Sequence, residues 1–112
     1  MISTENQGQV LVVRVNTVRL DSAVGTLIRN TVIAQLDSVS RVALDISQVK
    51  LVDSGGLGSL VALLKNVVSK QGKLALVGMH KSVRMMFELS RMDRQFLLVD
   101  QLDAALSTLN NA

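Results

Sequence analysis

Short runs of strand-forming residues alternate with segments of helical periodicity along this chain, and that alternation constrains the fold more than any other feature. Residues 10–15, 41–46 and 74–78 are apolar runs of strand length, and 96–99 is a shorter run near the end. Residues 17–20 are a candidate partner strand for 10–15. Parallel neighbours need long crossovers, which are usually helices. The order therefore predicts an α/β domain with a mostly parallel mixed sheet and about four helices.

Four segments carry residues at helical spacing. The first begins at Asp21 or Ser22, both good N-caps, and extends to about Asp37. The second begins just after Asp53 and stops near Gly72, and a short third helix and a closing fourth helix follow. The positions that define one side of each helix are Val24, Leu27, Ile28, Thr31 and Gln35; Leu57, Leu60, Val61, Leu64 and Val68; Val83, Met86 and Phe87; and Leu102, Ala105, Leu106 and Leu109.

The composition predicts one domain, residues 1–112, with an aliphatic core, since 48% of the residues are hydrophobic and only two are aromatic. The chain has no cysteine, which excludes disulfides and thiolate metal sites, and we expect neither a metal nor a cofactor. Residues 1–8 are polar, unlike a secretory signal, and no apolar run approaches the roughly 18 residues of a membrane span. We therefore expect a cytoplasmic protein that does not insert into membranes.

One part of the chain is distinctly basic. Residues 65–94 contain seven Lys or Arg side chains against two acidic ones, Glu88 and Asp93. Such a stretch can face nucleic acid, an anionic lipid surface or an acidic protein, or it can be the solvated side of two helices. Because the chain has no Tyr or Trp to stack on bases and no run of consecutive basic residues, we expect no nucleic-acid partner.

The residues that could support catalysis are few. A triad of Ser54, the single His80 and either Asp45 or Asp53 is formally possible, but Ser54 lacks the Gly-x-Ser-x-Gly elbow of hydrolases. The glycines of residues 55–58 match neither a phosphate-binding loop, which ends in Lys and Ser or Thr, nor a dinucleotide fingerprint. We therefore expect a binding protein rather than an enzyme, and an exposed loop position for His80.

Loops that leave the carboxyl ends of the strands, at residues 16–22, 47–56 and 78–81, are expected to gather on one rim of the sheet. Within the second of these loops, Asp53-Ser54 stands where the loop becomes a helix. Both residues are favoured N-caps, so a purely local role is one interpretation. The other is a regulatory role, because a phosphate on Ser54 would face the positive end of the helix and change the charge of the rim abruptly.

Residues 43–58, Ala-Leu-Asp-Ile-Ser-Gln-Val-Lys-Leu-Val-Asp-Ser-Gly-Gly-Leu-Gly, resemble the hallmark stretch of STAS domains, the anti-sigma factor antagonist family. The resemblance continues in three further segments that keep the family's order and spacing. Residues 19–21 are similar to the Leu-Asp before the first helix, 72–78 to the Gly-Gly-x-Leu strand, and 83–90 to the Val-x-x-x-Phe helix. Two departures are Gly55, where many members have Ser, and Asn16, where many have Gly.

The resemblance implies a phosphorylation-switched protein whose phosphoacceptor is Ser54. It implies that the unphosphorylated form binds a serine protein kinase that is also the anti-sigma factor, and that a protein phosphatase resets the switch. An alternative is a constitutive accessory subunit of a larger complex, such as a lipid-transport ABC ATPase. The residues that we expect at the partner-binding site are Asp21, Ser22, Asp53, Ser54, Gly55, Gly56 and Leu57.

Overall fold

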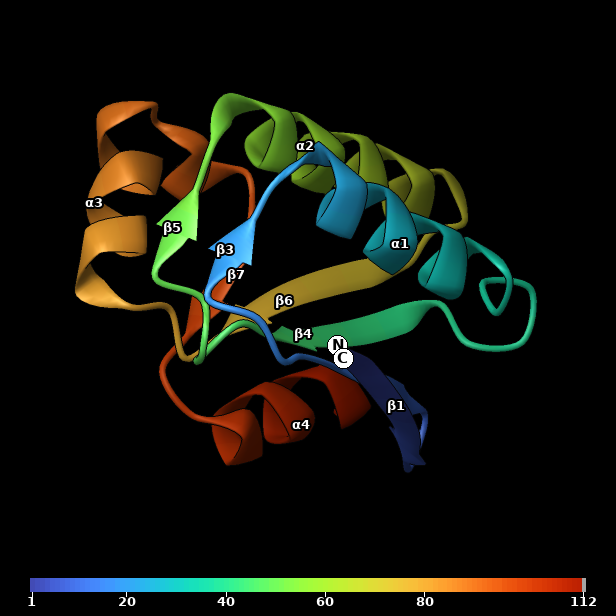
Figure 1. Ribbon diagram of the computed structural model, residues 1–112. Helices are drawn as coiled ribbons and strands as arrows, with labels where there is room; N and C mark the ends of the chain where they lie inside the picture. The colour runs from blue at the N-terminus through green and yellow to red at the C-terminus, as the bar shows by residue number, and fades with distance from the viewer. Residues whose placement is uncertain (112) are drawn as a thin grey trace.

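The computed structural model describes residues 1–111, which form seven strands, four α-helices and one short 3₁₀ helix (Figure 1). The elements are, in order, β1 (Ile2–Gln7), β2 (Val10–Val15), β3 (Arg19–Leu20), α1 (Ser22–Ile33), β4 (Arg41–Asp45), β5 (Leu51–Val52), α2 (Ser54–Ser69), β6 (Lys73–Val77), α3 (Lys81–Leu89), η1 (Met92–Arg94), β7 (Leu97–Val99) and α4 (Leu102–Asn110).

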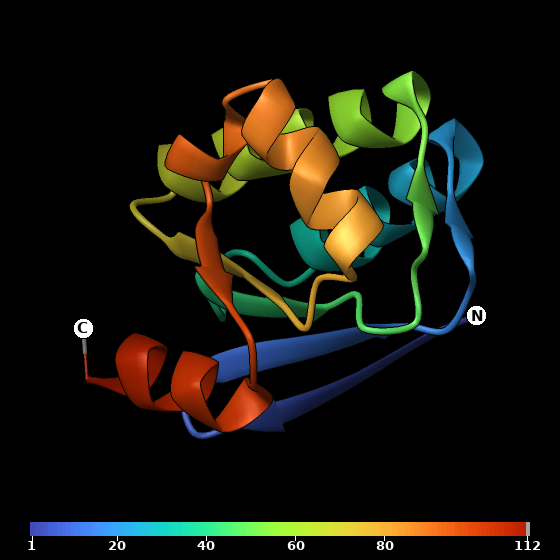
Figure 2. The same ribbon diagram turned by 90° about the vertical axis from the view of Figure 1, so that its left-hand side faces the viewer.

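The main sheet has the strand order β1-β2-β4-β6-β7, with β1 antiparallel to β2 and all other neighbours parallel. Helices α1, α2 and α3 cover one face of this sheet and α4 covers the other (Figures 1 and 2). The central strands are mainly apolar because both of their faces are buried: Leu11 and Val13 point to the three-helix side, and Val10 and Val12 point to α4. Their charged residues are Arg14, Arg41, Asp45 and Lys73. The predicted fold class is therefore confirmed.

The expectation that residues 17–20 pair with 10–15 is wrong. The free edge of β2 is taken by β1, which returns through a turn at Gly8, a residue with a φ of 64°. Strand β3 instead pairs in parallel with β5 in a separate two-stranded sheet. Strand β1 escaped the sequence analysis because this edge strand is exposed along most of its length and shows no hydrophobic alternation.

The helices are confirmed in number and order, but two details of the sequence prediction are wrong. Helix α1 ends at Ile33 and not near Asp37. Leu27 and Val68, which were placed on buried stripes, are 45% and 57% exposed. The buried sides are instead Val24, Gly25, Ile28 and Val32 in α1, and Gly56, Leu60, Leu63 and Val67 in α2.

Small residues explain this rotation of the buried faces. Helices α1 and α2 pack against each other so closely that a Cβ atom at Gly25 would overlap the side chain of Ser59. Glycine therefore occupies buried positions that a hydrophobic pattern assigns to larger residues. The close packing also brings the N-termini of α1 and α2 to the same edge of the domain (Figure 1). Within residues 1–111, no helix combines the length and the apolar character needed to cross a bilayer.

Candidate functional site

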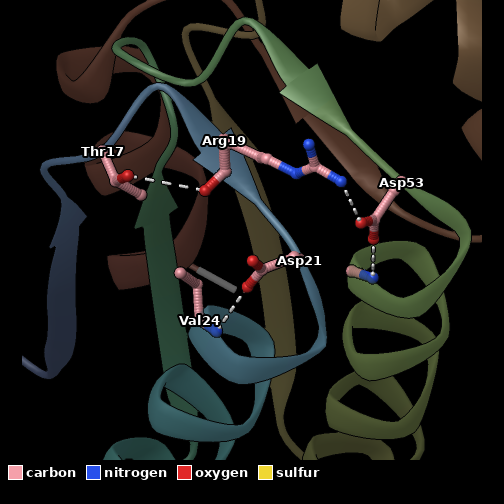
Figure 3. Close-up of polar contacts among 6 residues, drawn as sticks. Thr17, Arg19, Asp21, Val24 and Asp53 are labelled. Carbon is pink, nitrogen blue, oxygen red and sulfur yellow. Dashed lines mark hydrogen bonds and ion pairs between the residues drawn. The ribbon is translucent and has the colours of Figure 1, made fainter.

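Two helix N-termini meet at the carboxyl end of the small β3–β5 sheet, each capped by an aspartate (Figure 3). The Val24 N–H donates to Asp21 Oδ1 at 3.0 Å, and the Gly56 N–H donates to Asp53 Oδ1 at 2.8 Å. Because strand pairing aligns Leu20 with Val52, it sets the two capping residues side by side. The sequence prediction that Asp21 shares a rim with Asp53 is thus confirmed.

Glycine permits the close approach at the start of α2. A Cβ atom at Gly56 would overlap the carbonyl oxygen of Leu20, so only glycine fits there without a shift of the backbone. Gly55 lies beside α1, since a Cβ atom on it would stand 3.0 Å from the Cβ of Ser22. A serine at position 55 would press against Ser22 in this chain.

The negative charge of the Asp53 carboxylate is stabilised by an ion pair with Arg19. Arg19 Nη2 donates to Asp53 Oδ2 at 3.1 Å, so the two carboxylate oxygens of Asp53 serve different partners (Figure 3). The hydrogen bond from the Gly56 N–H, and after it that from Arg19, hold the pKa of the Asp53 carboxyl below its usual value. Both side chains reach solvent, with exposed fractions of 60% for Arg19 and 34% for Asp53. The rim therefore presents an ionised carboxylate beside Ser54.

Ser54 is the first residue of α2, and its side chain is exposed. The N-cap is Asp53, whose backbone is extended and whose side chain bonds to the third residue of the turn. Within residues 1–111, the Ser54 hydroxyl makes no hydrogen bond. The local role that the sequence left open to Ser54, that of the N-cap, therefore belongs to Asp53.

His80 has a local role of its own. It is exposed, as expected, and it caps α3 by accepting the Ser82 N–H on Nδ1. Ser82 Oγ in turn donates to the carbonyl oxygen of Lys50, which ties α3 to β5. Across residues 1–111, no three histidine, aspartate or glutamate side chains gather as a metal site would require.

Comparison with known proteins gives the family. A family model described as the STAS domain matches residues 1–105. The chain belongs to the STAS domain family. The match leaves only the last seven of the 112 residues outside, and it confirms the resemblance found in residues 43–58.

Solved structures with the same STAS fold include anti-sigma factor antagonists. One from Mycobacterium paratuberculosis is 25% identical, with 97% of this chain and 92% of that chain covered at a TM-score of 0.83. The anti-sigma factor antagonist SpoIIAA, in its unphosphorylated form, is 16% identical, with 100% and 98% covered at a TM-score of 0.83. The phosphorylated form of SpoIIAA from Bacillus is also 16% identical, with 96% and 98% covered at a TM-score of 0.75.

In this STAS domain the expected site residues lie together but are not equally accessible. Ser22 and Ser54 are exposed; Asp21, Asp53, Gly55 and Leu57 are partly buried; Gly56 is buried. The sequence analysis missed Arg19, whose guanidinium completes the rim. Its position two residues before Asp21 was the only signal, and the pairing of β3 with β5 was needed to show its partner.

Proposed function

We propose that this chain is a cytoplasmic anti-sigma factor antagonist, a regulatory binding protein that is switched by phosphorylation of Ser54. In the unphosphorylated form it binds a serine protein kinase that is also an anti-sigma factor, through the rim formed by residues 21–22 and 53–57. A protein phosphatase returns the phosphorylated form to the binding state. The chain itself carries out no turnover.

The observation that carries this proposal is the division of roles between Asp53 and Ser54. Asp53 caps α2, while Ser54 presents an exposed hydroxyl one residue further on. A kinase can reach that hydroxyl without removing a hydrogen bond that the fold uses. The family match and the likeness to SpoIIAA in unphosphorylated and phosphorylated forms support the same assignment.

The electrostatics of the rim explain how such a switch works. A phosphate adds about −1.5 to −2 charges at neutral pH. At the start of α2 the positive end of the helix dipole stabilises that charge locally, and Arg19 lies within reach of the same turn. The ionised Asp53 carboxylate beside it makes the modified surface strongly anionic. A partner surface that accepts the neutral serine is then repelled, while the helix remains folded.

The alternative of a constitutive accessory subunit predicts that Ser54 matters only for the fold. In that case Ser54 would be expected at the N-cap, a position that Asp53 holds in the structure. The alternative also predicts that charge at position 54 leaves complex formation unchanged. The two functions therefore differ in one measurable property, the dependence of partner capture on charge at Ser54.

The test is capture of partners from a native lysate on the immobilised wild-type chain and on Ser54→Asp, with mass spectrometry of the captured proteins and of Ser54. We expect a serine kinase on the wild type, its loss on Ser54→Asp, and phosphate on Ser54 after incubation with ATP. The control is Ser107→Asp, which adds the same charge at an exposed serine of α4, on the opposite face of the sheet. Equal capture by wild type and Ser54→Asp would contradict the proposal.

A further inference from the structure

A second feature of α2 lies beyond Ser54, on the side of the helix that faces residues 92–96. A groove of about 170 Å³ opens there between α2 and the segment that joins α3 to β7. Its lining residues are Val61, Leu64, Lys65, Met92, Gln95 and Phe96. The proposed switch at Ser54 does not use this groove.

The groove has the size and lining of a pocket for one large apolar side chain. Its volume is close to the ~150 Å³ of an apolar cavity that holds a benzene ring. Phe96 forms a firm wall, since it is buried and packs edge-to-face on Phe87 with ring centroids 5.6 Å apart. Met92 is partly buried, and methionine adapts its shape readily to different partners.

Both segments that line the groove carry basic side chains. Lys65, the single charged residue of α2, is exposed at its edge. Arg91 and Arg94 are exposed on the segment that carries Met92, against one acidic neighbour, Asp93. An apolar recess with basic side chains around it is complementary to an acidic segment that carries an apolar anchor. Because the feature is a recess and does not protrude, it suits an inserted side chain better than a lipid surface.

The groove is continuous with the candidate site. Three further residues of α2 follow Ser54 at helical spacing: Val61, Lys65 and Val68 lie seven, eleven and fourteen positions after it. These spacings put all four residues along one side of the helix. Seven residues of helix correspond to about 10 Å, a distance well within a single protein interface. Val68 at the far end is 57% exposed. A partner that covers Ser54 and extends along this side reaches the groove.

We propose that this groove receives one large apolar side chain from an acidic segment of the partner protein, as an anchor separate from the switch at Ser54. This inference rests on the proposed function in one respect, that the chain acts by binding a protein. The anchor provides affinity that does not depend on phosphorylation, and the contact at Ser54 provides the regulation. Of the basic stretch between residues 65 and 94, Lys65, Arg91 and Arg94 are thereby assigned to an acidic protein.

The experiment is a titration, followed by the amide spectrum of the isotope-labelled full chain, with a short synthetic acidic peptide that contains a single Phe. We expect saturable shifts at Val61, Leu64, Lys65 and Phe96. Replacing the peptide's Phe with Ala should weaken binding about tenfold, because a central apolar anchor carries most of the energy of such a contact. Ser54→Asp should bind the peptide as the wild type does, so this result is independent of the test of the proposed function.

Two variants of the chain complete the test. Lys65→Glu should weaken the peptide about tenfold, whereas Lys73→Glu, a charge reversal at an exposed lysine of β6, should not. Val61→Thr keeps the shape of the groove wall and should also weaken binding. Three results would each overturn the proposal: no shifts at the groove up to millimolar peptide, equal binding of the Ala peptide, or a response only to vesicles of phosphatidylcholine and phosphatidylglycerol.

Discussion

Gly56 meets the backbone of Leu20 directly, since a Cβ atom on the glycine would overlap the carbonyl oxygen of the leucine. That oxygen also accepts the Asp53 N–H, at 3.3 Å. The first turn of α2 is therefore built against the last residue of β3, and this contact sets where Ser54 stands. The position of the candidate phosphoacceptor depends on the absence of one side chain.

Gly56→Ala should lower the free energy of unfolding by about 1–3 kcal/mol, because the added methyl group forces α2 away from β3. Gly58→Ala is the matched control, two residues along the same helix. No atom lies within 4 Å of a Cβ placed there, so this change should raise stability by about 0.4–1 kcal/mol. Urea denaturation of both variants measures the difference. Equal stability of the two chains would show that the contact with Leu20 is looser than the structure has it.

Ser54→Asp should change the free energy of unfolding by no more than about 0.5 kcal/mol, because the side chain is exposed and does not cap the helix. Ser54→Ala should be similarly stable and should still capture the partner, since it carries no added charge. Thermal melts of both variants beside the wild type measure this. If Ser54→Asp unfolds, loss of partner capture by that variant reports misfolding and the switch needs another test.

The Asp53 carboxylate should make stability depend on pH in the acid range. Its pKa is lowered in the folded chain, so it stabilises the fold above the unfolded pKa of about 4, and that contribution is lost as the pH falls through the folded pKa. The stability difference between wild type and Asp53→Asn should therefore be largest near neutral pH and shrink below about pH 4. Denaturation curves at a series of pH values follow this difference.

Arg19→Ala separates the two causes of that pKa shift. The variant loses the ion pair with Asp53 but keeps the hydrogen bond from the Gly56 N–H, which is the larger cause. We therefore expect Arg19→Ala to retain part of the acid dependence of the wild type. Complete loss of that dependence in Arg19→Ala would assign it to the guanidinium instead.

Leu57 lies between the rim and the core, partly buried against the main hydrophobic cluster. Leu57→Ala should lower the free energy of unfolding by roughly 1–2 kcal/mol, less than the ~2–5 kcal/mol of a fully buried leucine. Leu60→Ala, one turn away and only 1% exposed, supplies that upper value for comparison. An unchanged melting midpoint for Leu57→Ala would place this side chain at the interface alone.

The sequence predicted best those strands and helices whose burial leaves a clear hydrophobic pattern. Strands β2, β4 and β6 are buried on both faces, so their mainly apolar runs identified them, and α4 kept a clear helical period. The order of these elements was enough to predict a mostly parallel sheet. Strand β1 carries polar residues at an exposed edge and produces no pattern. Strand β3 was expected within residues 17–20, but its two residues gave no indication that its partner is β5.

The candidate site was partly within reach of the sequence. Asp53 and Ser54 stand at a recognisable helix start, yet which of them caps α2 depends on backbone geometry that local preference does not decide. The contacts of Arg19 with Asp53 and of Gly55 with Ser22 join residues more than thirty positions apart. Such contacts follow from the pairing of β3 with β5, and no residue pattern in the sequence predicts that pairing.

The different roles of Asp53 and Ser54 also affect how the rim around Ser54 can change during evolution. Asp53 serves the helix, the ion pair and the rim at once, so its replacement alters folding as well as recognition. Under the proposed function, Ser54 serves only the partner that recognises the surface. A descendant that no longer depended on the proposed kinase would keep the aspartate for structural reasons, while the serine could change. Adjacent residues would then record two different histories, one of the fold and one of its regulation.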